Sequence, residues 1–292
     1  MSFVVELACD CHVHVIGPQD QYPMCKDRPY TPAPAGMPAL QQHMGRMSVG
    51  RAVIVQPSVY GTDNRCLIDC LEAEPARFRG VAVAHPQVSD DALASMADKG
   101  ITGLRINLES TGADDLSAAL QAIRYWSSRL AGSGWHLQLY AGYKTINAAL
   151  AQLATLPIPL VIDHFGLIPP GLALKQLQSE ALYRRLAAGD VYVKLSGAYR
   201  VGRVDDAEKI AQLAHALLAA NDERLLWASD WPHTNREPGK LSTEVSSYRN
   251  IPAEALVQER SAWLMSSQAS QKVLIDNPAR LYRFDRIAAK AK

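Results

Sequence analysis

The stretch CDCHVHVIGP, residues 9–18, places two histidines one residue apart after a short apolar lead-in. In a β-strand, side chains two residues apart point to the same face, so His12 and His14 would lie side by side. Cys11 and Val13 would then pack on the opposite face. Two neighbouring imidazoles can be an ordinary hydrogen-bonded pair, or they can bind a metal or take part in catalysis. The rest of the chain has to decide between these interpretations.

Seven further short, apolar segments are predicted strands, at residues 51–58, 80–85, 103–108, 136–140, 160–166, 191–197 and 225–233. Segments with helical patterning lie between strands, at residues 64–78, 90–100, 116–134, 145–156 and 206–221. Eight strands that alternate with helices indicate an α/β protein with a parallel sheet, and their number favours a closed (β/α)8 TIM barrel over an open sheet. No G-x-G-x-x-G follows an early strand, as it would in a dinucleotide-binding fold. We expect residues 1–292 to form one barrel domain.

Two segments fall outside this repeating pattern. Residues 17–47 are rich in glycine and proline, which predicts a loop over the exit of the first strand. The final DNPARLY, residues 276–282, predicts a helix with Asp276 or Asn277 as its cap and Pro278 in its first turn. We expect this helix to close the barrel.

The bulk composition limits the kinds of partner. With 30 Lys+Arg against 29 Asp+Glu, the chain has no basic excess for nucleic acid or anionic membranes, so we expect a small-molecule partner. No apolar run approaches the ~20 residues that span a bilayer, and MSFVVELACD does not resemble a signal peptide. We expect a cytoplasmic protein of undetermined oligomeric state. The odd number of cysteines without zinc-ribbon spacing indicates reduced thiols, at Cys9, Cys11, Cys25, Cys66 and Cys70.

Most of the predicted strands are apolar at their start and polar at their end. The C-terminal ends of the strands in a TIM barrel meet at one mouth, where the active sites of this fold lie. The sequence therefore predicts a site at this mouth. The polar residues at the strand ends are His12, His14, Gln56, Ser58, Arg105, Asn107, Gln138, Tyr140, His164, Lys194, Ser196 and Asp230.

The H-x-H pair, the late histidine in DHFG (163–166) and the aspartate in ASDWPH (228–233) resemble the amidohydrolase superfamily. More narrowly, the chain is similar to the branch that contains 2-pyrone-4,6-dicarboxylate lactonase and related lactone hydrolases. The further motifs RPYTP, VIVQPSVYGTDN, GLRINL, GWHLQLY, VKLSGAYR and DNPARLY extend this similarity over nearly the whole chain. The resemblance implies a hydrolase on an amidohydrolase-type TIM barrel.

The resemblance leaves two possibilities for a metal. Two-metal members of the superfamily need a bridging Lys or Glu on the fourth strand and a histidine at the end of the fifth. Here the fourth strand ends with Arg105 and Asn107, and a guanidinium cannot bind a cation. The fifth ends with Gln138 and Tyr140, while His136 stands at its start. The lactonase branch is metal-independent, which implies no cofactor. The alternative is one Zn²⁺, with three nitrogens and one oxygen from His12, His14, His164 and Asp230.

The lactonase resemblance implies a mechanism in which Asp230 is the general base that deprotonates water. His12, His14 and His164 would polarise the lactone carbonyl in place of a metal. The alternative for Asp230 is a helix N-cap, because aspartate is frequent at strand–helix junctions.

The expected substrate is a small, acidic lactone. Arg105 is the first candidate to bind its carboxylate, with a buried ion pair as the alternative. Arg200 is a second candidate, with a surface salt bridge as the alternative. Tyr30, Ser58 and Tyr140 are candidates to hydrogen-bond the substrate, or they are packing residues.

The chain departs from the pyrone-dicarboxylate pattern at two positions where that pattern has arginines. Residues 109–116 read ESTGADDL, and Leu167 follows the strand-six histidine in HFGLIPP. This predicts fewer negative charges on the substrate, so a muconolactone, a sulfonated lactone or a sugar-acid lactone competes with the dicarboxylate, in aromatic or acid catabolism. A zinc-dependent decarboxylase on the same barrel is the main alternative. A barrel that binds an aromatic metabolite without turnover is disfavoured, because the aspartate and the histidines are all present.

Overall fold

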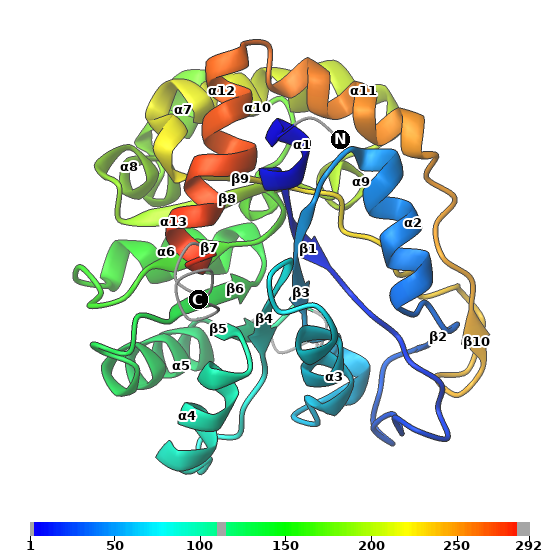
Figure 1. Ribbon diagram of the computed structural model, residues 1–292. Helices are drawn as coiled ribbons and strands as arrows, with labels where there is room; N and C mark the ends of the chain where they lie inside the picture. Colours follow the sequence, from blue (N-terminus) through cyan, green and yellow to red (C-terminus); the bar gives the residue numbers. More distant parts are fainter. Residues whose placement is uncertain (1–2, 110–114, 285–292) are drawn as a thin grey trace.

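The computed structural model describes residues 3–109 and 115–284 (Figure 1). Within these residues, eight parallel strands form one sheet in the order β1-β3-β4-β5-β6-β7-β8-β9. This confirms the predicted (β/α)8 barrel, and each predicted strand contains or overlaps an observed one. The strands are β1 (Cys9–Val13), β3 (Arg51–Val55), β4 (Phe78–Ala82), β5 (Ile101–Asn107), β6 (His136–Tyr140), β7 (Leu160–Ile162), β8 (Val191–Ser196) and β9 (Leu225–Ala228).

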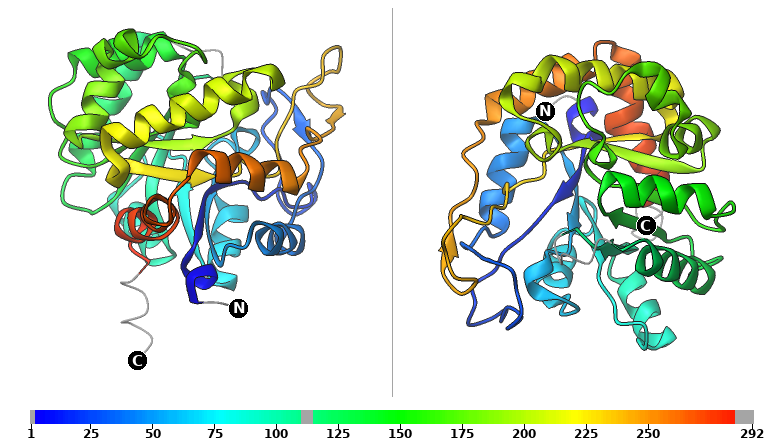
Figure 2. Two further views of the ribbon diagram at one scale, coloured as in Figure 1. Left: turned by 90° about the horizontal axis from the view of Figure 1, so that it is seen from above. Right: turned by 180° about the vertical axis from the view of Figure 1, so that it is seen from behind.

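Helices cover the outside of the barrel (Figures 1 and 2). They pack through one apolar face each: α3, for example, buries Cys66, Leu67, Cys70 and Leu71, which share a face at helical spacing. Among the described residues, every helix is too short or too polar to span a bilayer. The longer helices are α3 (Arg65–Ala73), α4 (Asp90–Asp98), α5 (Leu116–Arg129), α6 (Tyr143–Gln152), α8 (Ala181–Ala188), α10 (Ala207–Asn221) and α11 (Ala253–Trp263).

The seam between the first and last strands lies at the mouth of the barrel. The Asp230 amide donates to the His12 carbonyl at 3.1 Å, and the His14 amide donates to the Trp231 carbonyl at 2.8 Å. These bonds join two segments that are more than two hundred residues apart in the sequence. They also hold the H-x-H pair directly beside Asp230.

The segment 17–47 differs from its prediction as a loop. It contains the short strand β2 (Thr31–Pro32) and the helix α2 (Met37–Met47). Pro38 stands in the first turn of α2, where a proline leaves no hydrogen bond unmade. Leu40, Met44 and Met47 are buried at helical spacing. The prediction was wrong because it counted Pro38 as a helix breaker.

The C-terminal helix α13 (Asn277–Tyr282) confirms the helix predicted there, but not its cap. Asp276 has helical torsion angles (φ −70°, ψ −46°), since α12 (Ser267–Gln271) runs through a π-helical turn into α13. Tyr282 is buried with its ring 5.2 Å from that of His136, the first residue of β6. The helix therefore covers the end of the barrel at which the strands begin.

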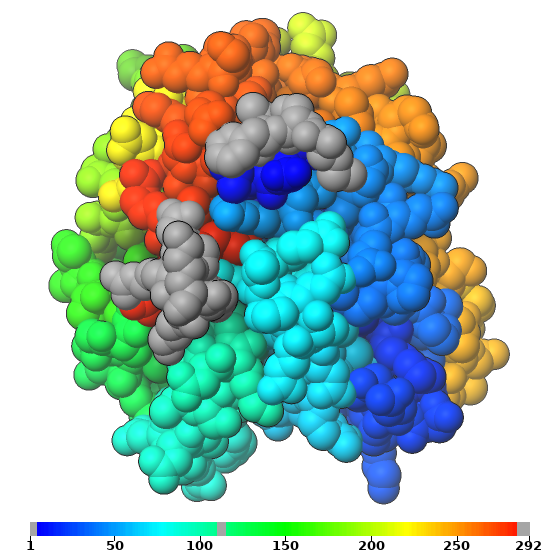
Figure 3. All heavy atoms as spheres, viewed as in Figure 1, coloured from blue at the N-terminus to red at the C-terminus, as the bar shows by residue number. Residues whose placement is uncertain are grey.

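The two ends of the barrel are built from different parts of the chain. The helix α1 (Phe3–Leu7) and the C-terminal helices meet on one face (Figure 3). The segment with the short strand β10 (Val245–Ser246), which follows β9, stands toward the opposite end (Figure 2). β10 pairs in parallel with β2. The helices α1 and α13 thus lie away from the mouth.

Candidate active site

A pocket of about 250 Å³ opens at the mouth of the barrel. His12 lies at its base and is fully buried. The other predicted site residues all line the pocket: His14, Tyr30, Ser58, Arg105, Tyr140, His164, Arg200 and Asp230. The segment after β9 adds four residues that the sequence analysis did not predict: Thr234, Asn235, Arg236 and Arg249.

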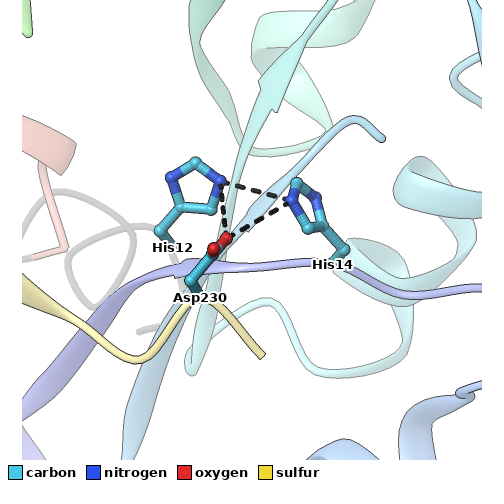
Figure 4. A group of neighbouring side chains, drawn as sticks. All are labelled: His12, His14 and Asp230. Atoms are coloured by element: carbon cyan, nitrogen blue, oxygen red, sulfur yellow. Dashed lines mark hydrogen bonds and ion pairs between the residues drawn. The ribbon is translucent and has the colours of Figure 1, made fainter. Parts of the chain in front are cut away.

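Three imidazoles surround one carboxylate oxygen of Asp230. The Nε2 atoms of His12, His14 and His164 lie 3.7, 3.9 and 4.0 Å from its Oδ1. The Nε2 atoms of His12 and His14 are 3.3 Å apart, and Figure 4 marks this contact with a dashed line. This buried oxygen accepts no hydrogen bond from the described residues. A buried polar atom without a partner is uncommon, and here it marks the position for a water, a substrate atom or a metal.

The other oxygen of Asp230, Oδ2, has two strong donors. Arg200 Nε and the Tyr199 hydroxyl each donate to it at 2.5 Å. Burial would raise the pKa of Asp230, but Arg200, followed by the surrounding histidines, outweighs burial and holds this pKa well below its usual value. Asp230 is therefore charged near neutral pH. No described helix begins directly after it, so the structure does not support the N-cap alternative.

Arg200 thus has a different partner from the one its prediction suggested. Its guanidinium is committed to Asp230, and its NH2 atom also donates to Thr234 Oγ1 at 3.3 Å. The side chain is largely buried, so the surface salt bridge considered for it does not describe this pair. Arg200 lines the pocket, but its shortest contact is the ion pair with the Asp230 carboxylate.

The hydrogen-bond partners of the histidines define their tautomers. His14 Nδ1 lies 2.8 Å from the Val55 carbonyl, which only accepts, so neutral His14 carries its proton there and presents Nε2 as an acceptor. The bond between the two Nε2 atoms then requires the proton on His12 Nε2. His12 Nδ1 accepts from Lys194 Nζ, 3.3 Å away.

All three imidazoles are neutral at pH 7. Burial lowers the pKa of His14 to about 4 and that of His164 to about 4. Burial, assisted by the charge of Lys194, also holds the pKa of His12 well below its usual range. His164 Nδ1 lies 2.9 Å from the Ser196 hydroxyl, which can donate or accept. When Ser196 donates, His164 presents an N–H toward the pocket.

A buried polar network lies beneath the histidines, and the sequence analysis missed its centre, Asp163. Asp163 Oδ2 accepts from Gln138 Nε2 at 3.0 Å, and Lys194 Nζ donates to Gln138 Oε1 at 2.7 Å. Lys194 Nζ also lies 3.4 Å from Asp163 Oδ1. Lys194 had been placed on the inward face without a role. The signal for Asp163 was its position beside His164, directly after the apolar strand LVI.

Arg105 makes the buried ion pair considered for it, but at a long distance. Its NH2 atom lies 3.5 Å from Asp163 Oδ2, and its NH1 atom lies 3.5 Å from the Gln56 carbonyl, both at the limit of a hydrogen bond. Its Nε makes no hydrogen bond to any described residue. The guanidinium also lies over the Tyr140 ring, 5.6 Å from its centroid. Arg105 is therefore weakly paired and retains donors for a ligand.

The residues at the two departures from the pyrone-dicarboxylate pattern do not replace the missing arginines. Residues 110–114 of the acidic segment lie outside the described residues, and Glu109 lines the pocket. Leu167 is not among the lining residues.

His12, His14 and Asp230 have the atoms to hold one metal ion, since their ligand atoms all lie within 4.8 Å of one another. Two imidazole nitrogens and a carboxylate oxygen suit Zn²⁺, which would polarise a carbonyl and lower the pKa of a bound water. These residues fit one such ion. The positions that would bind a second carry Arg105 on β5 and Gln138 and Tyr140 on β6.

Comparisons with known proteins identify the family of the chain. The amidohydrolase family model matches residues 9–284. The chain is 28% identical to a 4-sulfomuconolactone hydrolase of Hydrogenophaga intermedia, covering 94% of this chain and 88% of that protein. It is also 28% identical to a 2-pyrone-4,6-dicarboxylate hydrolase of Comamonas testosteroni, covering 94% and 90%. A solved structure from Pseudomonas putida, described as a 2-pyrone-4,6-dicarboxylic acid hydrolase, has 30% identity and a TM-score of 0.79, covering 96% and 98%. The chain belongs to the amidohydrolase family.

Proposed function

We propose that this protein is a hydrolase that opens a small, acidic lactone, with Asp230 as the general base that activates water. The observation that carries this proposal is Asp230 Oδ1, a charged and buried oxygen without a hydrogen bond to the described residues, placed among three neutral imidazoles. The names of the relatives support a lactone such as 2-pyrone-4,6-dicarboxylate or sulfomuconolactone.

In the proposed reaction, a water molecule attacks the lactone carbonyl carbon while Asp230 Oδ1 takes its proton. The bond from the carbonyl carbon to the ring oxygen then breaks, and the ring oxygen takes up the proton that Asp230 received, which gives a carboxylic acid and a hydroxyl group and restores the Asp230 carboxylate. His14 Nε2 already accepts from His12 Nε2–H, so this pair lies beside the water without taking a further hydrogen from it. Polarisation of the carbonyl falls to His164, whose Nε2 can donate. This assigns different tasks to the three histidines, which the sequence had treated as equivalent.

A carboxylate of the substrate would bind Arg105, whose Nε is without a hydrogen bond to the described residues. Bidentate pairing with a guanidinium would fix the ring beside Asp230. The aromatic face of Tyr140 lies between Arg105 and His164 and would contact the ring: its centroid is 5.6 Å from Arg105 Cζ and 5.0 Å from the His164 ring. Tyr30 and Ser58 would supply further hydrogen bonds from the opposite wall.

We also propose that the reaction proceeds without a metal. Three cations, Arg105, Arg200 and Lys194, already face the two carboxylates Asp163 and Asp230. A divalent ion would add two positive charges to a group of side chains whose net charge is already positive. The second candidate function, a zinc-dependent decarboxylase, is favoured by one observation, the fit of His12, His14 and Asp230 to a single zinc ion.

Two measurements on the same preparation test both candidates. The purified protein is analysed for transition metals and assayed with 2-pyrone-4,6-dicarboxylate, 4-sulfomuconolactone, muconolactone and a sugar-acid lactone. We expect ring opening of an acidic lactone that persists after chelator treatment, without a stoichiometric metal. About one zinc per chain, with CO₂ release from an aromatic acid and no ring opening, would instead establish the decarboxylase.

A further inference from the structure

The outer wall of the pocket is the segment 234–250, which follows β9. It is exposed over most of its length, but it is attached to the loop that carries Tyr30. β10 within it pairs with β2, and Thr31 Oγ1 donates to the Ser242 carbonyl at 2.7 Å. The Tyr248 hydroxyl donates to the Ala33 carbonyl. These contacts give this wall a defined position over the mouth.

Two arginines of this wall, Arg236 and Arg249, line the pocket. Neither has a carboxylate partner within ion-pair distance in the described part of the chain. The neighbouring acid, Glu237, is already occupied by Lys240 at 2.5 Å and by the Ser247 amide at 2.6 Å. Arg236 and Arg249 therefore keep their full charge available at the pocket.

The charge of the pocket lining is unequal. Four arginines line it, against the two carboxylates Glu109 and Asp230. Arg200 neutralises Asp230, and Arg105 faces Asp163 below. The surplus positive charge is thus located at the outer wall. A concave site lined by one sign of charge attracts ligands of the opposite sign.

Arg249 also lies close to the reaction centre. Its Cζ is 5.1 Å from the centroid of the Tyr199 ring, and Arg200 Cζ is 5.2 Å from the same centroid. The Tyr199 hydroxyl donates to Asp230. One aromatic ring therefore separates the arginine of the outer wall from the arginine that holds the proposed base. Two guanidinium groups on one ring repel each other, and an anion bound at Arg249 would relieve that repulsion.

We propose that Arg236 and Arg249 form an anion subsite that binds a second acidic group of the substrate, a carboxylate or a sulfonate. The substrate class becomes a dianionic lactone, with one acidic group on Arg105 and the other on this subsite. The inference rests on the proposed lactone hydrolysis and narrows it. The sequence analysis predicted fewer negative charges on the substrate, because two arginines of the pyrone-dicarboxylate pattern are absent. Under this proposal Arg236 and Arg249 of the outer wall compensate for those two arginines, and the substrate keeps its second charge.

A binding experiment tests the subsite without requiring turnover. Isophthalate, a planar ring with two carboxylates, is compared with benzoate by calorimetry on the wild type, on Arg236→Met/Arg249→Met and on Arg184→Met, an exposed arginine of α8 away from the pocket. We expect the wild type to prefer isophthalate. The double variant should lose at least about tenfold in isophthalate affinity and less than about twofold for benzoate, and Arg184→Met should change neither.

The proposal is overturned if the wild type binds isophthalate no better than benzoate, or if the double variant weakens both ligands equally. The anion subsite and the lactone hydrolase activity can be disproved separately. Turnover of acidic lactones that is insensitive to Arg236→Met/Arg249→Met would remove the subsite and keep the lactone hydrolase. Selective loss of isophthalate binding in a protein that opens no lactone would keep the subsite and remove the lactone hydrolase.

Discussion

The two ends of the barrel both bury charged side chains, but they treat them differently. At the end where the strands begin there is a cavity of about 580 Å³, more than twice the volume of the pocket at the mouth. Arg79 is buried there, and backbone carbonyls satisfy it: NH1 donates to Pro75 and Phe78 at 2.8 and 2.7 Å, and NH2 to Phe284 at 3.2 Å. Its Cζ lies 4.5 Å from the centroid of the Phe284 ring. Arg79 is thus satisfied without a ligand, and the buried atoms at this end that lack a hydrogen bond to the described residues belong to the neutral side chains of His136 and Tyr282.

At the mouth, two groups of opposite charge remain incomplete. Arg105 Nε and Asp230 Oδ1 are buried and have no hydrogen bond to the residues that the structure describes. An unsatisfied buried group costs free energy, so it persists where a ligand or a reaction makes use of it. The comparison teaches that cavity volume alone does not identify the site. Charged groups that line a pocket and keep unused hydrogen-bonding capacity do.

The largest expected effect is at the mouth. Asp230→Asn keeps the size of the side chain and removes its ability to take a proton from water, so we expect kcat to fall about 10²–10⁴-fold. Stability should fall modestly, because Arg200 loses its charged partner. The kcat of the variant is measured by steady-state kinetics, and its folding and stability are measured by circular dichroism and thermal unfolding. The matched control is Asp98→Asn at the other end of the barrel, which should leave kcat unchanged. Near-wild-type kcat in folded Asp230→Asn would show that Asp230 is only a structural acceptor.

A substitution at the opposite end should give the opposite pattern. Arg79→Met leaves buried carbonyls without a donor, at about 1–3 kcal/mol for each carbonyl that water does not reach. We expect a lower free energy of unfolding in urea and an unchanged kcat/KM per folded molecule. A variant with wild-type stability and reduced kcat/KM would contradict the division between a structural end and a chemical end.

Per histidine and per pH unit, the smallest effect is a pH dependence that both ends share. Burial lowers the pKa of His14 and His164 to about 4 at the mouth, and that of His136 to about 3 at the other end. The unfolded chain protonates histidine near pH 6.5, whereas the folded state does not until about pH 4. Stability should therefore fall as pH drops from about 6.5 to 4, by up to about 1.4 kcal/mol per pH unit for each histidine.

Two variants distinguish the contributions of the two barrel ends to this pH dependence. His136→Gln and His164→Gln should each reduce the slope of unfolding free energy against pH by the contribution of one histidine. Only His164→Gln should also reduce kcat. Stability that is constant over this pH range would mean that the histidines are not buried as neutral groups.

Much of the fold could be predicted because its signals are local. An apolar strand followed by polar residues can be recognised from a few consecutive side chains, and this pattern occurs in seven of the eight predicted strands. Residues 37–47 were missed because Pro38 suggested a break, whereas its position in the first helical turn allows the helix. The predicted N-cap of the last helix was wrong because a π-helical turn joins α13 to α12, so α13 has no free N-terminus there.

The polar residues of the candidate site were also predictable in kind, since most of them lie near or just after the end of a strand. Their partners were not. Arg200 was a candidate to bind substrate, and the structure adds a partner that the sequence did not reveal, Asp230 at 2.5 Å. Asp163 was quoted in a motif without a role, and it connects Gln138, Lys194 and Arg105. These contacts join strands that are far apart in sequence, so no local pattern reports them.

The sequence by itself determined the barrel, the end that carries the chemistry and the residue types found there, because strand periodicity and strand ends are properties of neighbouring residues. The tertiary structure decided which oxygen of Asp230 faces the histidines, which tautomer His14 adopts and where the surplus positive charge lies. Those properties depend on closing β1 against β9 and on fixing the segment 234–250 through β2 and β10. Both are contacts between segments about two hundred residues apart.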